Sequence, residues 1–113
     1  MYRVERAVAL VRMKKPFLDW INSADGPANL TLEIVNRESQ AYLLPEHGTP
    51  EELEEIMEDL YKEIFEIELA GYYTNRSCWP EISYERFLDW CDIEVHSMVF
   101  DPYKGKIKKE KFY

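Results

Sequence analysis

The chain has 113 residues, of which 46% are hydrophobic and 14% aromatic, so it is long and apolar enough to form one domain around its own core. Its formal net charge of −8 argues against direct binding to nucleic acid or to an anionic membrane, because both require Lys and Arg to neutralise phosphate. The same charge suits a basic partner, or solubility alone.

The N-terminal part predicts a strand followed by a short helix. Residues 3–13 read as the strand, and the run from Ala7 to Val11 is apolar on both faces, as in a strand that is covered on both sides or central in its sheet. Pro16 can open a helix over residues 17–22, because a first-turn position needs no N–H. The apolar run is too short for a signal peptide or a membrane span, so we expect a cytoplasmic protein.

The next segment is less regular. Residues 23–29 contain Asp25-Gly26-Pro27 and predict a loop. Residues 30–35 alternate like a strand but also fit a helical turn. Residues 40–44 predict a short strand that ends at Pro45.

The strongest local signal predicts a long amphipathic helix over residues 50–70. Thr49 is a good N-cap, Pro50 suits the first helical position, and Glu52 completes the capping pattern. Gly71 is a plausible terminator. Apolar residues recur at helical spacing along this segment: Leu53, Ile56, Met57, Leu60, Ile64 and Ile67.

The C-terminal part predicts an aromatic loop over residues 72–80, a short helix over 84–91 capped by Ser83, and a last strand over 92–101. The Lys-rich tail from Lys104 onward is expected to be mobile. The predicted order is β-α-β-α-α-β. We therefore expect an α+β domain over residues 1–103, with a small, mostly antiparallel sheet of three to four strands and one long and two short helices packed on it.

Several segments resemble a family of small uncharacterised bacterial proteins. They are Lys15-Pro16-Phe17-Leu18-Asp19-Trp20-Ile21-Asn22-Ser23, Ala41-Tyr42-Leu43-Leu44-Pro45-Glu46, Tyr61-Lys62-Glu63-Ile64-Phe65-Glu66, Trp79-Pro80 and the stretch from Asp92 to Asp101. The family has no established activity, so the resemblance transfers no catalytic residue. It implies a bacterial cytoplasmic setting and one complete domain, and the Lys-rich tail departs from it.

His96 is the most interesting single residue, because it lies beside Asp92 and Glu94 in the last predicted strand. A histidine near carboxylates can act as a general base. The simpler interpretation, which we favour, is a half-buried histidine that is hydrogen-bonded within the sheet. A small enzyme or ligand-binding domain around His96, the two acids and Trp20 or Trp90 is the alternative.

Other chemical signatures are weak. Cys78 and Cys91 have no metal-binding spacing and are most simply buried thiols, with a disulfide the less favoured alternative. Cys91 is a poor candidate nucleophile, because the adjacent Asp92 carboxylate should raise its pKa. The possible metal donors His47, Glu46, His96, Asp92 and Cys91 show no zinc-ligand spacing, so we do not expect a metal site. The sequence also contains no Gly-rich phosphate loop and no nucleophile elbow, and we expect no cofactor.

The charge layout is more informative. Residues 49–70 hold nine acids and one lysine, a net charge of −8, whereas residues 104–113 have a net charge of +4. The commoner explanation is a solvated helix face and a mobile tail. Our leading hypothesis is instead a non-enzymatic binding or regulatory protein, for example immunity- or inhibitor-like, that holds a basic protein partner. Its candidate residues are Glu51, Glu54, Glu55, Glu58 and Asp59, with Trp79 and Trp90 as weaker candidates. An oligomer formed through an exposed sheet face is a third possibility.

Overall fold

The computed structural model describes residues 1–23 and 29–112. The expected loop at Asp25-Gly26-Pro27 lies outside these ranges. The strands are β1 (Tyr2–Val4), β2 (Ala7–Met13), β3 (Gln40–Leu44), β4 (Cys91–His96) and β5 (Val99–Asp101). The helices are α1 (Lys15–Ser23), α2 (Leu32–Val35), α3 (Pro50–Ala70), the 3₁₀ turn η1 (Arg76–Cys78) and α4 (Tyr84–Trp90).

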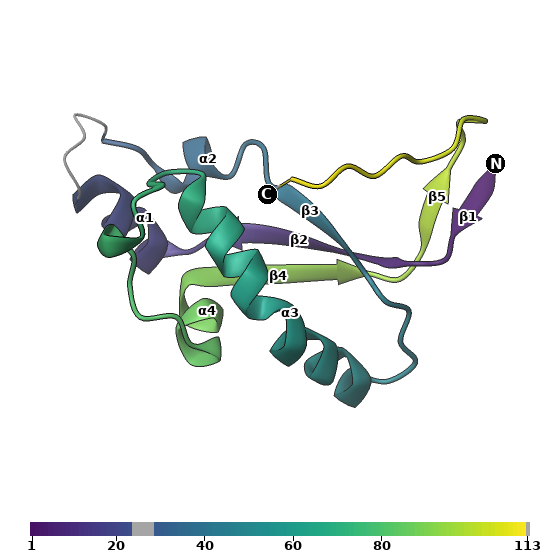
Figure 1. The fold of residues 1–113 in the computed structure, drawn as a ribbon, viewed down its shortest axis with the longest axis horizontal. Coiled ribbons are helices and arrows are strands. Elements are labelled where there is room, and N and C mark those ends of the chain that lie inside the picture. The colour runs from purple at the N-terminus through teal and green to yellow at the C-terminus, as the bar shows by residue number, and fades with distance from the viewer. Residues whose placement is uncertain (24–28, 113) are drawn as a thin grey trace.

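A three-stranded antiparallel sheet in the order β3-β2-β4 organises the fold (Figure 1). The central position of β2 confirms the expectation drawn from its continuous apolar run. Its residues alternate between buried and half-buried, because one face lies on the core and the other carries Val8, Leu10 and Arg12. The α+β class and the antiparallel pairing are confirmed.

The first and last expected strands are each divided in two, which the sequence did not predict. β1 pairs with β5 in a separate two-stranded ribbon that extends from one end of the main sheet (Figure 1). Between the pairs Val8–His96 and Val4–Val99, three residues of the first strand face two of the last. An extra residue on one strand is a bulge, and it bends the ribbon away from the sheet.

The helix boundaries follow local capping chemistry. The Thr49 hydroxyl accepts the Glu52 amide at 3.1 Å, and α3 runs over the predicted residues 50–70. Gly71 ends it with a φ of −63°, so the freedom of glycine to take a positive φ is not used. Of the ambiguous residues 30–35, Leu32–Val35 form the helical turn α2, because Thr31 caps it and accepts the Ile34 amide at 3.3 Å.

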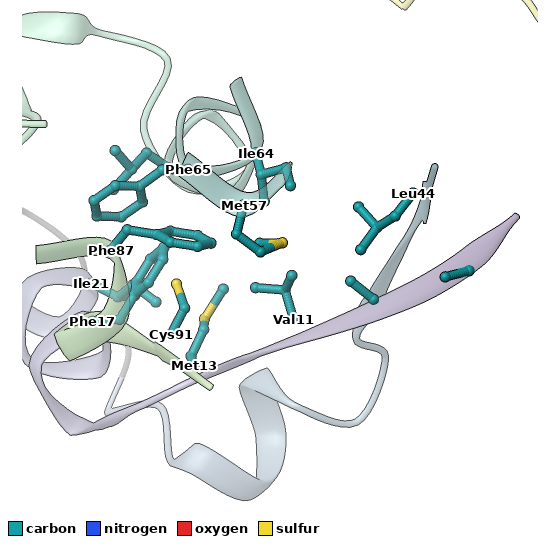
Figure 2. Close-up of a cluster of buried hydrophobic side chains, with 13 residues drawn as sticks. Val11, Met13, Phe17, Ile21, Leu44, Met57, Ile64, Phe65, Phe87 and Cys91 are labelled. Atoms are coloured by element: carbon teal, nitrogen blue, oxygen red, sulfur yellow. The ribbon is translucent and has the colours of Figure 1, made fainter. Parts of the chain in front are cut away.

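The core lies between the sheet and the helices α1, α3 and α4 (Figure 2). Side chains of α3, among them Met57 and Phe65, face Val11 and Met13 of β2. The two copies of Phe-Leu-Asp-Trp, in α1 and α4, meet in this core. Ring centroids are 5.5 Å apart for Phe17–Trp90 and 6.0 Å apart for Trp20–Trp90. The copies lie about 70 residues apart in the chain, and the fold brings their rings together.

Candidate functional site

His96 lies on the face of the sheet that points away from the core. Its side chain is 56% exposed, and its Nε2 lies 2.6 Å from Glu94 Oε2. Arg12 donates to the other Glu94 oxygen at 3.0 Å. These two partners hold the pKa of the Glu94 carboxyl below its usual value, with the His96 contact the larger cause. The expected hydrogen bond within the sheet is therefore present, but the expected half-burial of His96 is wrong.

The structure does not bring His96 together with the tryptophans. Trp90 immediately precedes β4 and His96 is its last residue, so the length of the strand from Cys91 to His96, about 17 Å at 3.3 Å per residue, lies between them. Trp20 donates its indole N–H to the Cys78 carbonyl oxygen at 2.9 Å. Asp92 is exposed beside Arg12, its register partner. The hollows that we describe below include none of these candidates.

The two cysteines are free, and their environments differ. Cys91 is 2% exposed on the core side of β4, as expected, but Cys78 is exposed, which corrects our expectation that both are buried. Burial, together with the Glu68 carboxyl, raises the pKa of the Cys91 thiol to about 12. The carboxyl that raises the pKa of Cys91 is thus that of Glu68 and not that of the adjacent Asp92, because Asp92 points to the opposite face of the strand.

The acidic residues of α3 form an exposed stripe. Glu51, Glu55, Glu58 and Asp59 are all exposed, and the described residues supply none of them with an ion pair. Their spacing of four, seven and eight residues places them along one side of the helix. Glu54, also exposed, accepts a hydrogen bond from the Tyr84 hydroxyl at 3.0 Å. We call Glu51, Glu55, Glu58 and Asp59 the acidic stripe.

Trp79 lines a hollow of about 330 Å³ at the C-terminal end of α3. Its indole N–H donates to the Tyr73 carbonyl oxygen at 2.6 Å, and Arg76 lies 4.7 Å from the centre of its ring. The C-terminal tail runs from β5 back toward the start of β3 (Figure 1), where Phe112 and Gln40 line the same hollow. The partly buried Trp79 ring packs against the core, so it covers the core and also shapes a surface hollow.

A second hollow contains the residue that sequence reasoning missed. Glu68 is 3% exposed, and it is the buried charged residue of the described chain. Its Oε2 accepts the Tyr42 hydroxyl at 2.5 Å. Burial raises the pKa of the Glu68 carboxyl, and the bond from Tyr42 opposes the rise only in part. The sequence did contain a signal for Glu68, because it lies four residues after Ile64 and three after Phe65 and so on the apolar side of α3.

The described residues contain no group of three or more His, Cys, Asp and Glu side chains arranged to hold a metal ion. None of the described helices has the length and apolar character needed to cross a bilayer.

No family model, curated protein or solved structure matches this chain.

Proposed function

We propose that this protein is a small binding or regulatory protein that holds a basic polypeptide partner on the acidic stripe of α3. The observation that carries the proposal is that all four carboxylates of the stripe are exposed without an ion pair from the described residues. Like charges four residues apart on a helix destabilise it by about 0.2–0.5 kcal/mol per pair. A partner that brings Lys and Arg to the stripe relieves this repulsion.

α3 also borders an apolar hollow that suits the docking of a polypeptide. Beside the middle of α3, a shallow hollow of about 200 Å³ is lined mainly by apolar side chains of α3 and the edge strand β3, among them Leu43, Leu60 and Ile67. Interfaces combine an apolar centre with a charged rim. The stripe supplies the charge that speeds association and orients a basic partner, and the hollow, on another side of α3, offers apolar area to a partner that extends around the helix. A bacterial cytoplasmic setting, implied by the family resemblance, is part of this proposal.

The test is affinity capture from a cell lysate at low and at high salt, with a cross-linker that identifies the contacted residues. The stripe variant carries Glu51→Gln, Glu55→Gln, Glu58→Gln and Asp59→Asn. The matched control makes the same four charge changes at exposed positions elsewhere: Glu5→Gln, Glu33→Gln, Glu81→Gln and Asp89→Asn.

We expect a basic protein that is cross-linked to α3 of the native chain, is captured by the control variant and is lost with the stripe variant. Its capture should also weaken at high salt, because mobile ions screen exposed charges beyond about 10 Å at 0.1 M. The proposal is contradicted if the same amount of partner is captured at high salt and by the stripe variant, or if no partner is cross-linked.

A further inference from the structure

The hollow around Glu68 has the properties of a ligand site that is separate from the acidic stripe. It has a volume of about 210 Å³ and lies between the C-terminal end of α3, the strand β2 and the connection from α2 to β3. Its lining residues are Val11, Met13, Val35, Asn36, Glu38, Ser39, Gln40, Glu68, Gly71 and Tyr72. The volume is below the usual range for drug-sized ligands, about 300–1,000 Å³, so it suits a small group.

One oxygen of Glu68 is available to a ligand. The Tyr42 hydroxyl bonds Oε2, whereas Oε1 accepts no hydrogen bond from the described residues. No buried side-chain oxygen of the described chain is left without a partner, so Oε1 must reach solvent. The solvent space that Glu68 lines is this hollow. One carboxylate oxygen of this nearly buried residue is therefore accessible to a ligand in the hollow.

The charge of the residues that line the hollow favours a cationic ligand. Glu68 lies deep in the wall, and the exposed Glu38 lies at the rim, whereas no Lys, Arg or His lines the hollow. Tyr72 also lines it, and its hydroxyl interacts electrostatically with Glu68 and has no hydrogen-bond partner among the described residues. Two carboxyls and a hydroxyl form a set of acceptors for a cation that carries N–H donors.

The structure supports the binding of an ammonium group more strongly than the binding of a metal ion. The amide group of Asn36 is already occupied, because it bonds the Met13 backbone N–H at 2.8 Å and carbonyl at 3.0 Å. Glu68 and Glu38 are the carboxylates of the hollow, and the described residues contain no group of three or more His, Cys, Asp and Glu side chains arranged to hold a metal ion. A primary ammonium needs only two or three acceptors.

We propose that the hollow binds a primary ammonium group, whose N–H groups donate to Glu68 Oε1 and to the Tyr72 hydroxyl. The group can belong to a free small amine or to a lysine side chain of a polypeptide. The adjoining Trp79 hollow shares Gln40 and Gly71 with this one and is lined by Phe112 of the Lys-rich tail, so a lysine-bearing segment already lies nearby.

The test uses the full chain and two probes, n-butylammonium and a synthetic peptide of residues 104–113. Binding is measured by calorimetry and by the carbon NMR signals of the Glu carboxyls, with the Glu68 signal assigned through the Glu68→Gln variant. Tetramethylammonium serves as a cation without N–H donors. Glu81→Gln is the matched control, because it makes the same change at an exposed position outside both the hollow and the acidic stripe.

We expect at least one of the two probes to bind and to shift the Glu68 signal. Glu68→Gln should weaken binding about ten-fold or more, whereas Glu81→Gln should leave it within about two-fold. Binding by butylammonium identifies a free amine as a sufficient ligand, and binding by the peptide alone identifies a polypeptide lysine. Tyr72→Phe, which keeps the ring, should weaken binding several-fold and provides a second test if Glu68→Gln fails to fold.

Affinity should also rise with pH as Glu68 loses its proton. The other titratable groups nearby are Tyr42, Tyr72 and Cys91, whose pKa values are all raised, and Glu38 at the rim. The proposal is wrong if neither probe binds, if Glu68→Gln binds like the native chain, or if tetramethylammonium binds as tightly as butylammonium. The stripe variant should bind butylammonium normally, so this test and that of the proposed function can fail independently.

Discussion

Replacing Phe87 by alanine should destabilise the protein more than any exposed substitution in α4. Phe87 is fully buried and is the buried residue through which α4 meets the core. Its ring centroid lies 5.5 Å from that of Phe65 and 6.1 Å from that of Tyr61, both in α3. Truncation leaves a cavity between the two helices. Buried Phe→Ala changes cost about 3–5 kcal/mol, against a total stability of about 5–15 kcal/mol for a domain.

The assay is urea denaturation, followed by tryptophan fluorescence and by far-UV circular dichroism. Trp90 is a suitable reporter because its ring centroid lies 5.9 Å from that of Phe65. With a urea m-value of about 1–3 kcal/mol per M, the expected loss lowers the midpoint by about 1 M or more. The two signals should change together if the domain unfolds in one step.

Leu88→Ala is the matched control, because Leu88 follows Phe87 in the same helix but is 39% exposed. It should change the free energy of unfolding by less than about 1 kcal/mol. Equal midpoint shifts for the two variants would refute the inference that α4 is held to α3 through Phe87.

Three further predictions concern single groups. Stability should fall as pH rises from 4.5, the ordinary glutamate pKa, through the raised pKa of folded Glu68, because in this range the folded state holds a proton that the unfolded state has lost. In thermal melts over a pH series, Glu68→Gln should flatten this part of the stability curve. An unchanged slope would contradict the raised pKa of Glu68. At pH 8 a thiol reagent should modify the exposed Cys78 quickly and Cys91 only after denaturant is added, and rapid double labelling of the native chain would show that Cys91 is not buried. Thr49→Ala should cost about 0.5–2 kcal/mol because it removes the cap of α3, whereas Thr31→Ala, at the cap of the four-residue α2, should cost less in the same urea assay.

Local sequence predicted the elements whose boundaries depend on neighbouring residues. The bounds of α3 and β3 match the prediction, because a cap, a proline and an apolar period act within a few residues of each other. The division of the first strand at Glu5 and Arg6 was not predicted. It depends on a bulge between strands that are about 90 residues apart in the chain, and that register is a property of the sheet.

The candidate sites divide in the same way. The acidic stripe could be located from charge and helical spacing, since exposed residues on one helix keep their positions whatever the helix packs against. The exposure of His96 and its distance from Trp90 could not be predicted, because a sequence alternates two faces without showing which one the core covers.

The sequence by itself determined an acidic α+β domain, the long helix over residues 50–70 and the concentration of charge on it. Helical spacing from Ile64 and Phe65 places Glu68 on the apolar side of α3, but only the tertiary structure shows how it is buried. Folding places β2, β3 and Tyr72 around it and removes most of its water. Burial depends on surfaces brought together from distant segments, and it is burial that changes the chemistry of a carboxyl group.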